Sequence, residues 1–144
     1  MQHNVDVLVI GAGQAGLAMG YYLKQKNILF AIVGKEDRIG DVWRNRYDSL
    51  VLFTPRWFSS LPGMALMGDQ NGYPTKDEIA DYLEDYAQKY ELPVHLNTEV
   101  QRGVTSVKGL YFLGLPWQYR RGSALIGGVG DDAEYLINDI LKIK

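Results

Sequence analysis

Short apolar runs alternate with a helical pattern in the first third of the chain. Residues 5–10 form a mostly apolar run of the kind that a buried parallel strand has. Apolar positions then follow helical spacing from residue 14 to about Gln25, and Asn27 marks the end of that helix. Residues 30–33 are apolar again and predict a second strand. The opening is therefore a β-α-β unit of about 30 residues.

The middle of the chain has no clean period until residue 75. Residues 39–72 carry glycine, proline and aromatic side chains throughout. So long an irregular stretch in a small domain is usually functional or packed on another element. Thr75 and Glu78 then have the spacing of a capping box, and a helix with one apolar face follows until Leu92.

The last part of the chain predicts two further strands and a helix. Residues 94–96, with a continuation as far as Val100, form the third strand, and residues 110–113 form the fourth. A helix is expected over about Asp131 to Lys142. The whole pattern predicts an α/β, Rossmann-type domain of three layers, with a small parallel sheet of strand order 3-2-1-4.

The composition of the chain argues against several classes of function. The length of 144 residues and the 47% hydrophobic content fit one domain, and the net charge of −2 argues against a nucleic-acid partner. The absence of cysteine excludes disulfides and thiol redox chemistry, and no metal or hydrolytic constellation stands out. The polar start and the short first apolar run predict neither a signal peptide nor a membrane span, so the expected location is the cytoplasm.

A glycine-rich motif joins the first strand to the first helix. Gly11-Ala-Gly-Gln-Ala-Gly16 matches the G-x-G-x-x-G pattern of dinucleotide-binding domains in the required context. Gly11 permits the tight turn, Gly13 lets the backbone approach a pyrophosphate, and Gly16 lets helix and strand pack closely. The N–H groups of the first helical turn, at Gln14 and Ala15, attract the phosphates. The alternative is a strand-to-helix turn without a ligand.

The end of the second strand is where an acidic side chain is expected to hold the ribose, about 20 residues after the glycines. The sequence there is Gly34-Lys35-Glu36, and Glu36 is the candidate, with Lys35 beside it. The alternative is that these charges form a solvated turn.

Further motifs cover nearly the full length of the chain. They lie at residues 9–16, 39–44, 46–50, 52–55, 60–63, 73–75, 109–117, 121–125 and 128–133. With these motifs the chain resembles the flavin-containing monooxygenase-like members of the FAD-dependent pyridine nucleotide-disulfide oxidoreductases. The resemblance implies that the nucleotide is FAD.

The resemblance also assigns cofactor contacts outside the glycine motif. It implies that a first segment passes the flavin and its ribityl chain, at Gly40, Val42, Trp43 and Arg44. Leu52 and Thr54 are implied near the isoalloxazine ring, and the Val100 backbone near the adenine. N–H groups at Asp132 and Ala133 are implied at the pyrimidine side of the ring, where a helix N-terminus favours negative charge.

Two alternatives stay open within these motifs. Arg44 and Arg46 either meet the pyrophosphate or pair with Asp41 and Asp48. Residues 128–133 either contact the same FAD or form a second nucleotide motif.

The chain departs from the family pattern in two places. The family usually carries an acid at the position of Gly34, and it inserts a second Rossmann domain, for NADPH, between the segments equivalent to Val100 and Leu110. Only residues 101–109 stand there in this chain. We therefore expect a single FAD-binding domain over residues 1–144, in which a short connection between residues 1–100 and 110–144 replaces the NADPH domain.

The expected function is that of a truncated or minimised flavin monooxygenase-like oxidoreductase that does not use NADPH efficiently. One alternative is a small active flavin oxidoreductase that works with an external reductant or partner. Another is a non-catalytic nucleotide-binding module. A homodimer through the surface left by the missing domain, at Trp57, Phe58, Leu115 and Trp117, is a further alternative.

Overall fold

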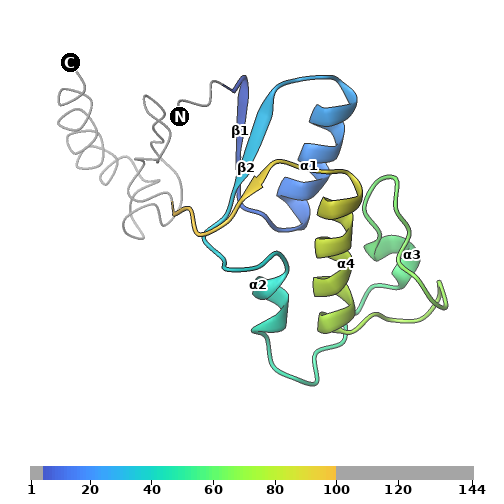
Figure 1. The fold of residues 1–144 in the computed structure, drawn as a ribbon. Helices are drawn as coiled ribbons and strands as arrows, with labels where there is room; N and C mark the ends of the chain where they lie inside the picture. The colour runs from blue at the N-terminus through green and yellow to red at the C-terminus, as the bar shows by residue number, and fades with distance from the viewer. Residues whose placement is uncertain (1–4, 100–144) are drawn as a thin grey trace, which may run out of the picture. The chain divides into compact units, whose positions relative to one another are not determined.

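The computed structural model describes residues 5–99. Within them, Val5–Thr98 form one compact unit. The elements are β1 (Val7–Ile10), α1 (Gln14–Gln25), β2 (Phe30–Val33), α2 (Asp41–Arg44), α3 (Arg56–Ser59), α4 (Lys76–Lys89) and β3 (Val94–His95) (Figure 1).

The strands form a parallel sheet in the order β1-β2-β3. Val7 pairs with Phe30, and Ile32 pairs with Val94, so β2 lies between the other two strands. All four residues of β2 are buried, which explains why this strand is apolar throughout. The arrangement confirms the α/β class and the 3-2-1 part of the expected order. The fourth strand, the last helix and the layer they would form lie outside the described residues.

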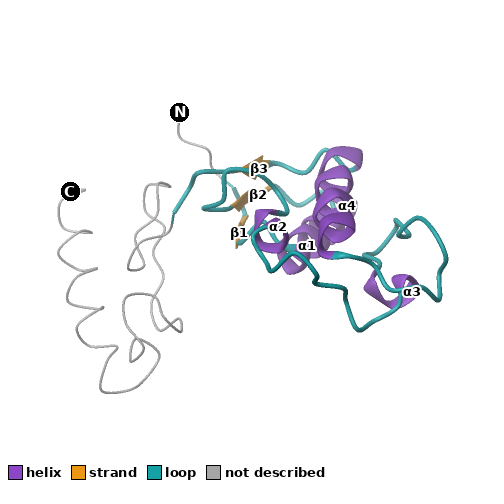
Figure 2. Cartoon of the chain, turned by 90° about the horizontal axis from the view of Figure 1, so that it is seen from below, coloured by secondary structure: helices purple, strands orange, loops and turns teal. Residues whose placement is uncertain are grey.

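A hydrophobic core joins the sheet to the two long helices, α1 and α4. Figures 1 and 2 show the course of these elements. Helix α1 packs on β1 and β2, and α4 packs beside α1. The most buried side chains of the core come from three elements: Leu17 from α1, Ile32 from β2, and Leu83 and Tyr86 from α4. No helix within residues 5–99 is long and apolar enough to cross a membrane.

The helix boundaries follow the signals in the sequence. Helix α1 ends at Gln25, and Asn27 adopts a left-handed φ of 54°. Helix α4 begins with the expected capping box: the Thr75 hydroxyl accepts from the Glu78 N–H, and the Glu78 carboxylate accepts from the Thr75 N–H. The outer strands are shorter than expected, because β1 begins only at Val7 and β3 ends at His95.

The irregular stretch between β2 and α4 contains two single-turn helices, α2 and α3, which are too short for a period to show. Backbone bonds tie this stretch to the segment just before α4. The Leu52 N–H donates to the Pro74 carbonyl at 2.9 Å, and the Arg56 N–H donates to the Gly72 carbonyl at 3.0 Å. The stretch is therefore held against the start of α4.

Candidate functional site

The glycine motif forms a tight turn from β1 into α1. A Cβ atom added at Gly16 would lie 1.9 Å from the Gly11 carbonyl oxygen, so only glycine permits this approach of helix to strand. Gly13 is the N-cap of α1 and offers no side-chain cap, and the first turn carries no acidic residue. A Cβ at Gly13 would meet nothing within 4 Å among the residues that the structure describes. The Gly13 position therefore leaves room beside the N-terminus of α1, as an anion site requires.

The Glu36 carboxylate lies beside the end of β2. A Cβ added at Gly34 would come within 2.9 Å of both Glu36 Oε2 and Ala12 Cβ. Glu36 is half-buried, and the Asn97 N–H donates to its carbonyl at 3.1 Å. Glu36 thus folds back toward the strand end, and its carboxylate takes the space that a side chain at residue 34 would need. Lys35, in contrast, is exposed.

A first cavity adjoins both the glycine turn and Glu36. Gly13 and Glu36 line it together with the start of α2, at Gly40, Val42 and Trp43. Because these residues come from three separate segments, the fold brings together predicted residues that are far apart in the sequence.

A second cavity has a volume of about 320 Å³, and Trp43 and Leu83 line both cavities. Four residues assigned from the sequence line it: Gln14, Trp43, Leu52 and Thr54. The Trp43 indole N–H donates to the Gln14 side-chain oxygen at 3.3 Å. The walls of this second cavity are mostly apolar, and its size suits an aromatic ring system.

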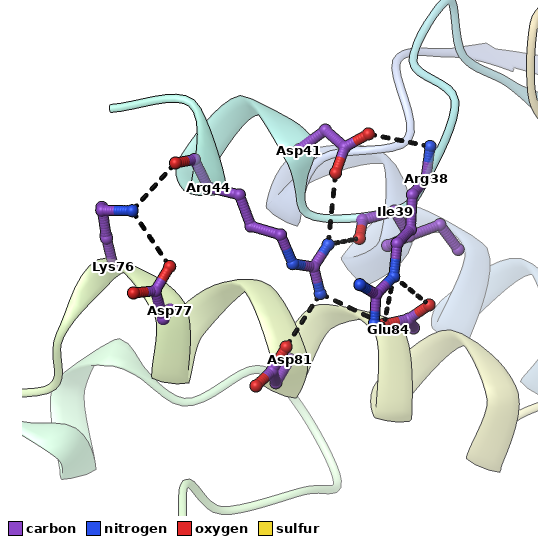
Figure 3. A network of polar contacts seen from close by, with 8 residues as sticks. All are labelled: Arg38, Ile39, Asp41, Arg44, Lys76, Asp77, Asp81 and Glu84. Atoms are coloured by element: carbon purple, nitrogen blue, oxygen red, sulfur yellow. Dashed lines mark hydrogen bonds and ion pairs between the residues drawn. The ribbon is translucent and has the colours of Figure 1, made fainter. Parts of the chain in front are cut away.

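An ion-pair network fixes α2, and with it Trp43, on α4 (Figure 3). The Arg44 guanidinium donates to the Ile39 carbonyl at 2.6 Å, to Asp81 at 2.8 Å and to Glu84 at 3.1 Å. Arg38 donates two hydrogen bonds from its Nε and one from its Nη2 to the same Glu84 carboxylate. These bonds lower the pKa of Glu84 below its ordinary value, with the Arg38 hydrogen bond as the largest cause.

The network bears on the two alternatives for Arg44. Its guanidinium lies 3.4 Å from Asp41, as the pairing alternative expects, and it also reaches two acids of α4 that the sequence did not indicate. The buried Lys76 adds to the same attachment, since its ammonium donates to the Arg44 carbonyl at 2.8 Å. In this structure the Arg44 guanidinium contacts α4 and so holds α2 in place, and its contact with a pyrophosphate stays a prediction.

The remaining predicted residues have different locations. Ala15 lies exposed on the first turn of α1. Val100, Asp132 and Ala133 lie outside the described residues, so their contacts stay predictions.

Several residues that line the second cavity were not assigned from the sequence as site residues. They are Phe58, Ser59, Ser60, Leu61, Ile79, Tyr82 and Leu83. The last three were expected on the apolar side of α4, but helical spacing does not tell a core contact from a cavity wall. Ser60 and Leu61 belong to a motif of the family resemblance, which was the only signal that could have indicated them.

The chain is similar in sequence to known oxidoreductases. The family described as pyridine nucleotide-disulphide oxidoreductase matches residues 8–114. An uncharacterized CzcO-like oxidoreductase of Geobacillus kaustophilus is 92% identical over 100 residues, which are 69% of this chain and 29% of that protein. A CzcO oxidoreductase of Bacillus subtilis is 54% identical over 108 residues, covering 75% of this chain and 31% of that protein.

Among solved structures, a flavin-containing monooxygenase from Stenotrophomonas maltophilia matches with a TM-score of 0.64 and 43% identity. The match covers 68% of this chain and 30% of that protein. The chain therefore spans less than a third of the length of each of these relatives.

Proposed function

The chain belongs to the pyridine nucleotide-disulphide oxidoreductase family, and from this premise we propose that it is an FAD-binding flavoprotein of the flavin monooxygenase type. The observation that carries the proposal is the set of residues that line the two cavities. Gly13 and Glu36 line the first cavity, and Trp43 lines both the first and the second. Bound FAD supplies electron transfer, and the residues of the chain bind and orient it.

The glycine turn holds the pyrophosphate. Its geometry fits this group because the position of Gly13 leaves room that a Cβ would fill, and the first turn of α1 is free of acidic residues. The N–H groups at Gln14 and Ala15 and the positive end of the helix dipole attract the negative charge.

Glu36 holds the adenosine ribose and so replaces the acid that the family usually carries at the position of Gly34. The support is its carboxylate, which lies where a side chain at residue 34 would begin and lines the cavity next to Gly13. A carboxylate at this point accepts hydrogen bonds from the two ribose hydroxyls.

The second cavity takes the flavin ring. Trp43 and Leu52 provide apolar walls, and the Thr54 hydroxyl, which shares a hydrogen bond of 2.7 Å with Ser59, provides a polar edge. The Val100 backbone contacts the adenine, and N–H groups at Asp132 and Ala133 contact the pyrimidine side of the isoalloxazine ring. These three assignments rest on the family resemblance.

The chain does not carry out NADPH-driven monooxygenation. The support is the sequence between Val100 and Leu110, where nine residues stand in place of the second nucleotide domain. Without that domain the reducing equivalents have to come from another donor. Any activity is then limited to reduction by light or small donors and reoxidation by oxygen.

The test is the visible absorption spectrum of the purified full chain, followed by heat release of the cofactor and anaerobic addition of NADPH. We expect oxidised flavin bands, about one FAD per chain, and flavin reduction by NADPH no faster than that of free FAD. A folded protein that is colourless and refuses added FAD would contradict the cofactor assignment. Fast, NADPH-dependent oxygen consumption would contradict the claim on activity and favour a small active oxidoreductase.

A further inference from the structure

A row of tyrosines on α4 holds the turn at residues 61–64. Tyr82 and Tyr86 of α4 and Tyr90, its C-cap, lie four residues apart and so share one side of the helix. Their hydroxyls donate to three successive carbonyls of the turn: Tyr86 to Pro62 at 2.7 Å, Tyr90 to Gly63 at 2.6 Å, and Tyr82 to Met64.

The turn has little freedom to move on this row. Gly63 has a left-handed φ of 79°, and a Cβ there would lie 2.5 Å from the Tyr90 hydroxyl and 2.8 Å from the Tyr21 ring. The Met64 N–H closes the turn by donating to the Leu61 carbonyl at 3.3 Å. The turn is therefore pressed directly onto the aromatic side chains.

Tyr82 differs from the other two tyrosines in two respects. Its hydroxyl also accepts a hydrogen bond of 2.6 Å from the Leu61 N–H, so it holds both ends of the turn. Its side chain lines the second cavity together with Leu61, whereas neither Tyr86 nor Tyr90 lines it. Burial raises the pKa of Tyr82, which keeps the hydroxyl protonated and able to donate at neutral pH.

We propose that Tyr82 is a positioning residue for the flavin ring, because its hydroxyl fixes Leu61 as a wall of the ring cavity. The inference rests on the proposed function and adds a determinant of ring binding to it. Loss of the hydroxyl leaves the part-buried Leu61 N–H and Met64 carbonyl without this partner. Polar groups that lose a partner in this way bind water or move to a new position. Leu61 then shifts, and the cavity no longer fits the ring closely.

The experiment compares Tyr82→Phe with Tyr86→Phe in the full chain. Both changes keep the ring: Tyr86→Phe removes one hydroxyl bond to this turn, and Tyr82→Phe removes two. Only Tyr82 lines the cavity. In the FAD-loaded protein we expect Tyr82→Phe to shift the visible flavin bands, to increase quenching of flavin fluorescence by iodide, and to raise the Kd for FAD about tenfold. Tyr86→Phe should lower Tm without these changes. A Tyr82→Phe protein with wild-type bands, quenching and Kd would overturn the proposal.

Two further measurements cover the other outcomes. Leu61→Ala removes the wall but keeps the bonds of Tyr82, and decides the matter if Tyr82→Phe does not fold. It should show the same spectral shift, and an unchanged spectrum would overturn the proposal.

Amide hydrogen exchange of the cofactor-free chain reports the bond itself: Tyr82→Phe should expose the Leu61 N–H, and Tyr86→Phe should not. A wild-type chain that binds no FAD would instead overturn the proposed function.

Discussion

Glu84 is the acidic side chain that the ion-pair network of α2 and α4 shares. It accepts hydrogen bonds from both Arg38 and Arg44, and these arginines remain charged at any ordinary pH. The ionised carboxylate is therefore favoured in the folded chain, and the pKa of Glu84 is lower there than in the unfolded chain. Its contribution to stability is present above the unfolded pKa and is lost as the pH falls through the folded one.

We therefore expect Glu84→Gln to flatten the acid side of the stability profile. At pH 7 the variant should have a lower Tm than the wild type, and the difference should shrink as the pH falls below about 4.5, where the wild type loses the same interaction. Asp85→Asn is the matched control, because Asp85 is an exposed acid on the same helix. Thermal unfolding between pH 3 and pH 7 checks the prediction, and parallel curves for Glu84→Gln and wild type would contradict it.

At the scale of elements, α4 is the support on which the site is assembled. It carries the acids that hold α2, the tyrosines that hold the turn at residues 61–64, and the Leu83 side chain shared by both cavities. Its N-terminus depends on the capping box between Thr75 and Glu78, which satisfies N–H groups that the helix itself leaves without partners. The stability of this cap therefore affects the whole site.

Removal of the cap should be measurable as a loss of stability. We expect Thr75→Ala to lower the free energy of unfolding by about 1 kcal/mol, because the Glu78 N–H loses its acceptor. Thr75→Ser retains a hydroxyl and should lose only a small part of this. Urea unfolding of the three proteins, followed by circular dichroism, gives the values. Equal losses for the alanine and serine variants would show that the hydroxyl bond does not stabilise the helix.

At the scale of the whole molecule, the proposed cofactor spans the site from Glu36 to the second cavity. In this proposal the pyrophosphate lies between these ends, at the glycine turn, so the adenylate half and the flavin half would have separate contacts. A ligand that binds only the folded chain stabilises it by an amount that rises with the logarithm of the ligand concentration divided by its Kd. The two halves can therefore be distinguished by thermal unfolding.

We expect FAD to stabilise the chain far more than FMN, because FMN lacks the adenylate that Glu36 and the glycine turn hold in this proposal. At a concentration of about 100 times its Kd, FAD should add about 2.7 kcal/mol. Glu36→Gln should weaken the effect of FAD and leave that of FMN unchanged, which makes the two ligands controls for each other. Equal shifts of Tm with FAD and FMN would contradict the assignment of the adenylate site.

The sequence alone determined the three described strands, the two long helices and the glycine motif, because their signals are local. The run at residues 30–33 is apolar since β2 is buried, and the motif from Gly11 to Gly16 specifies a turn that only glycine permits at its end. The capping box at Thr75 likewise fixed the start of α4. Each of these features depends on residues close together in the chain, so its pattern can be recognised without the fold.

Only the tertiary structure decided which distant residues share a site. The ion pairs of Arg44 with α4, the approach of Glu36 to the end of β2, and the bonds of Tyr82 to the turn at residues 61–64 join segments that no local pattern relates. The spacing of α4 gave its apolar side but not which of its residues would border a cavity. Such contacts arise from how the elements pack. The pattern along the chain shows that a residue is buried, but it does not show which residues the side chain contacts.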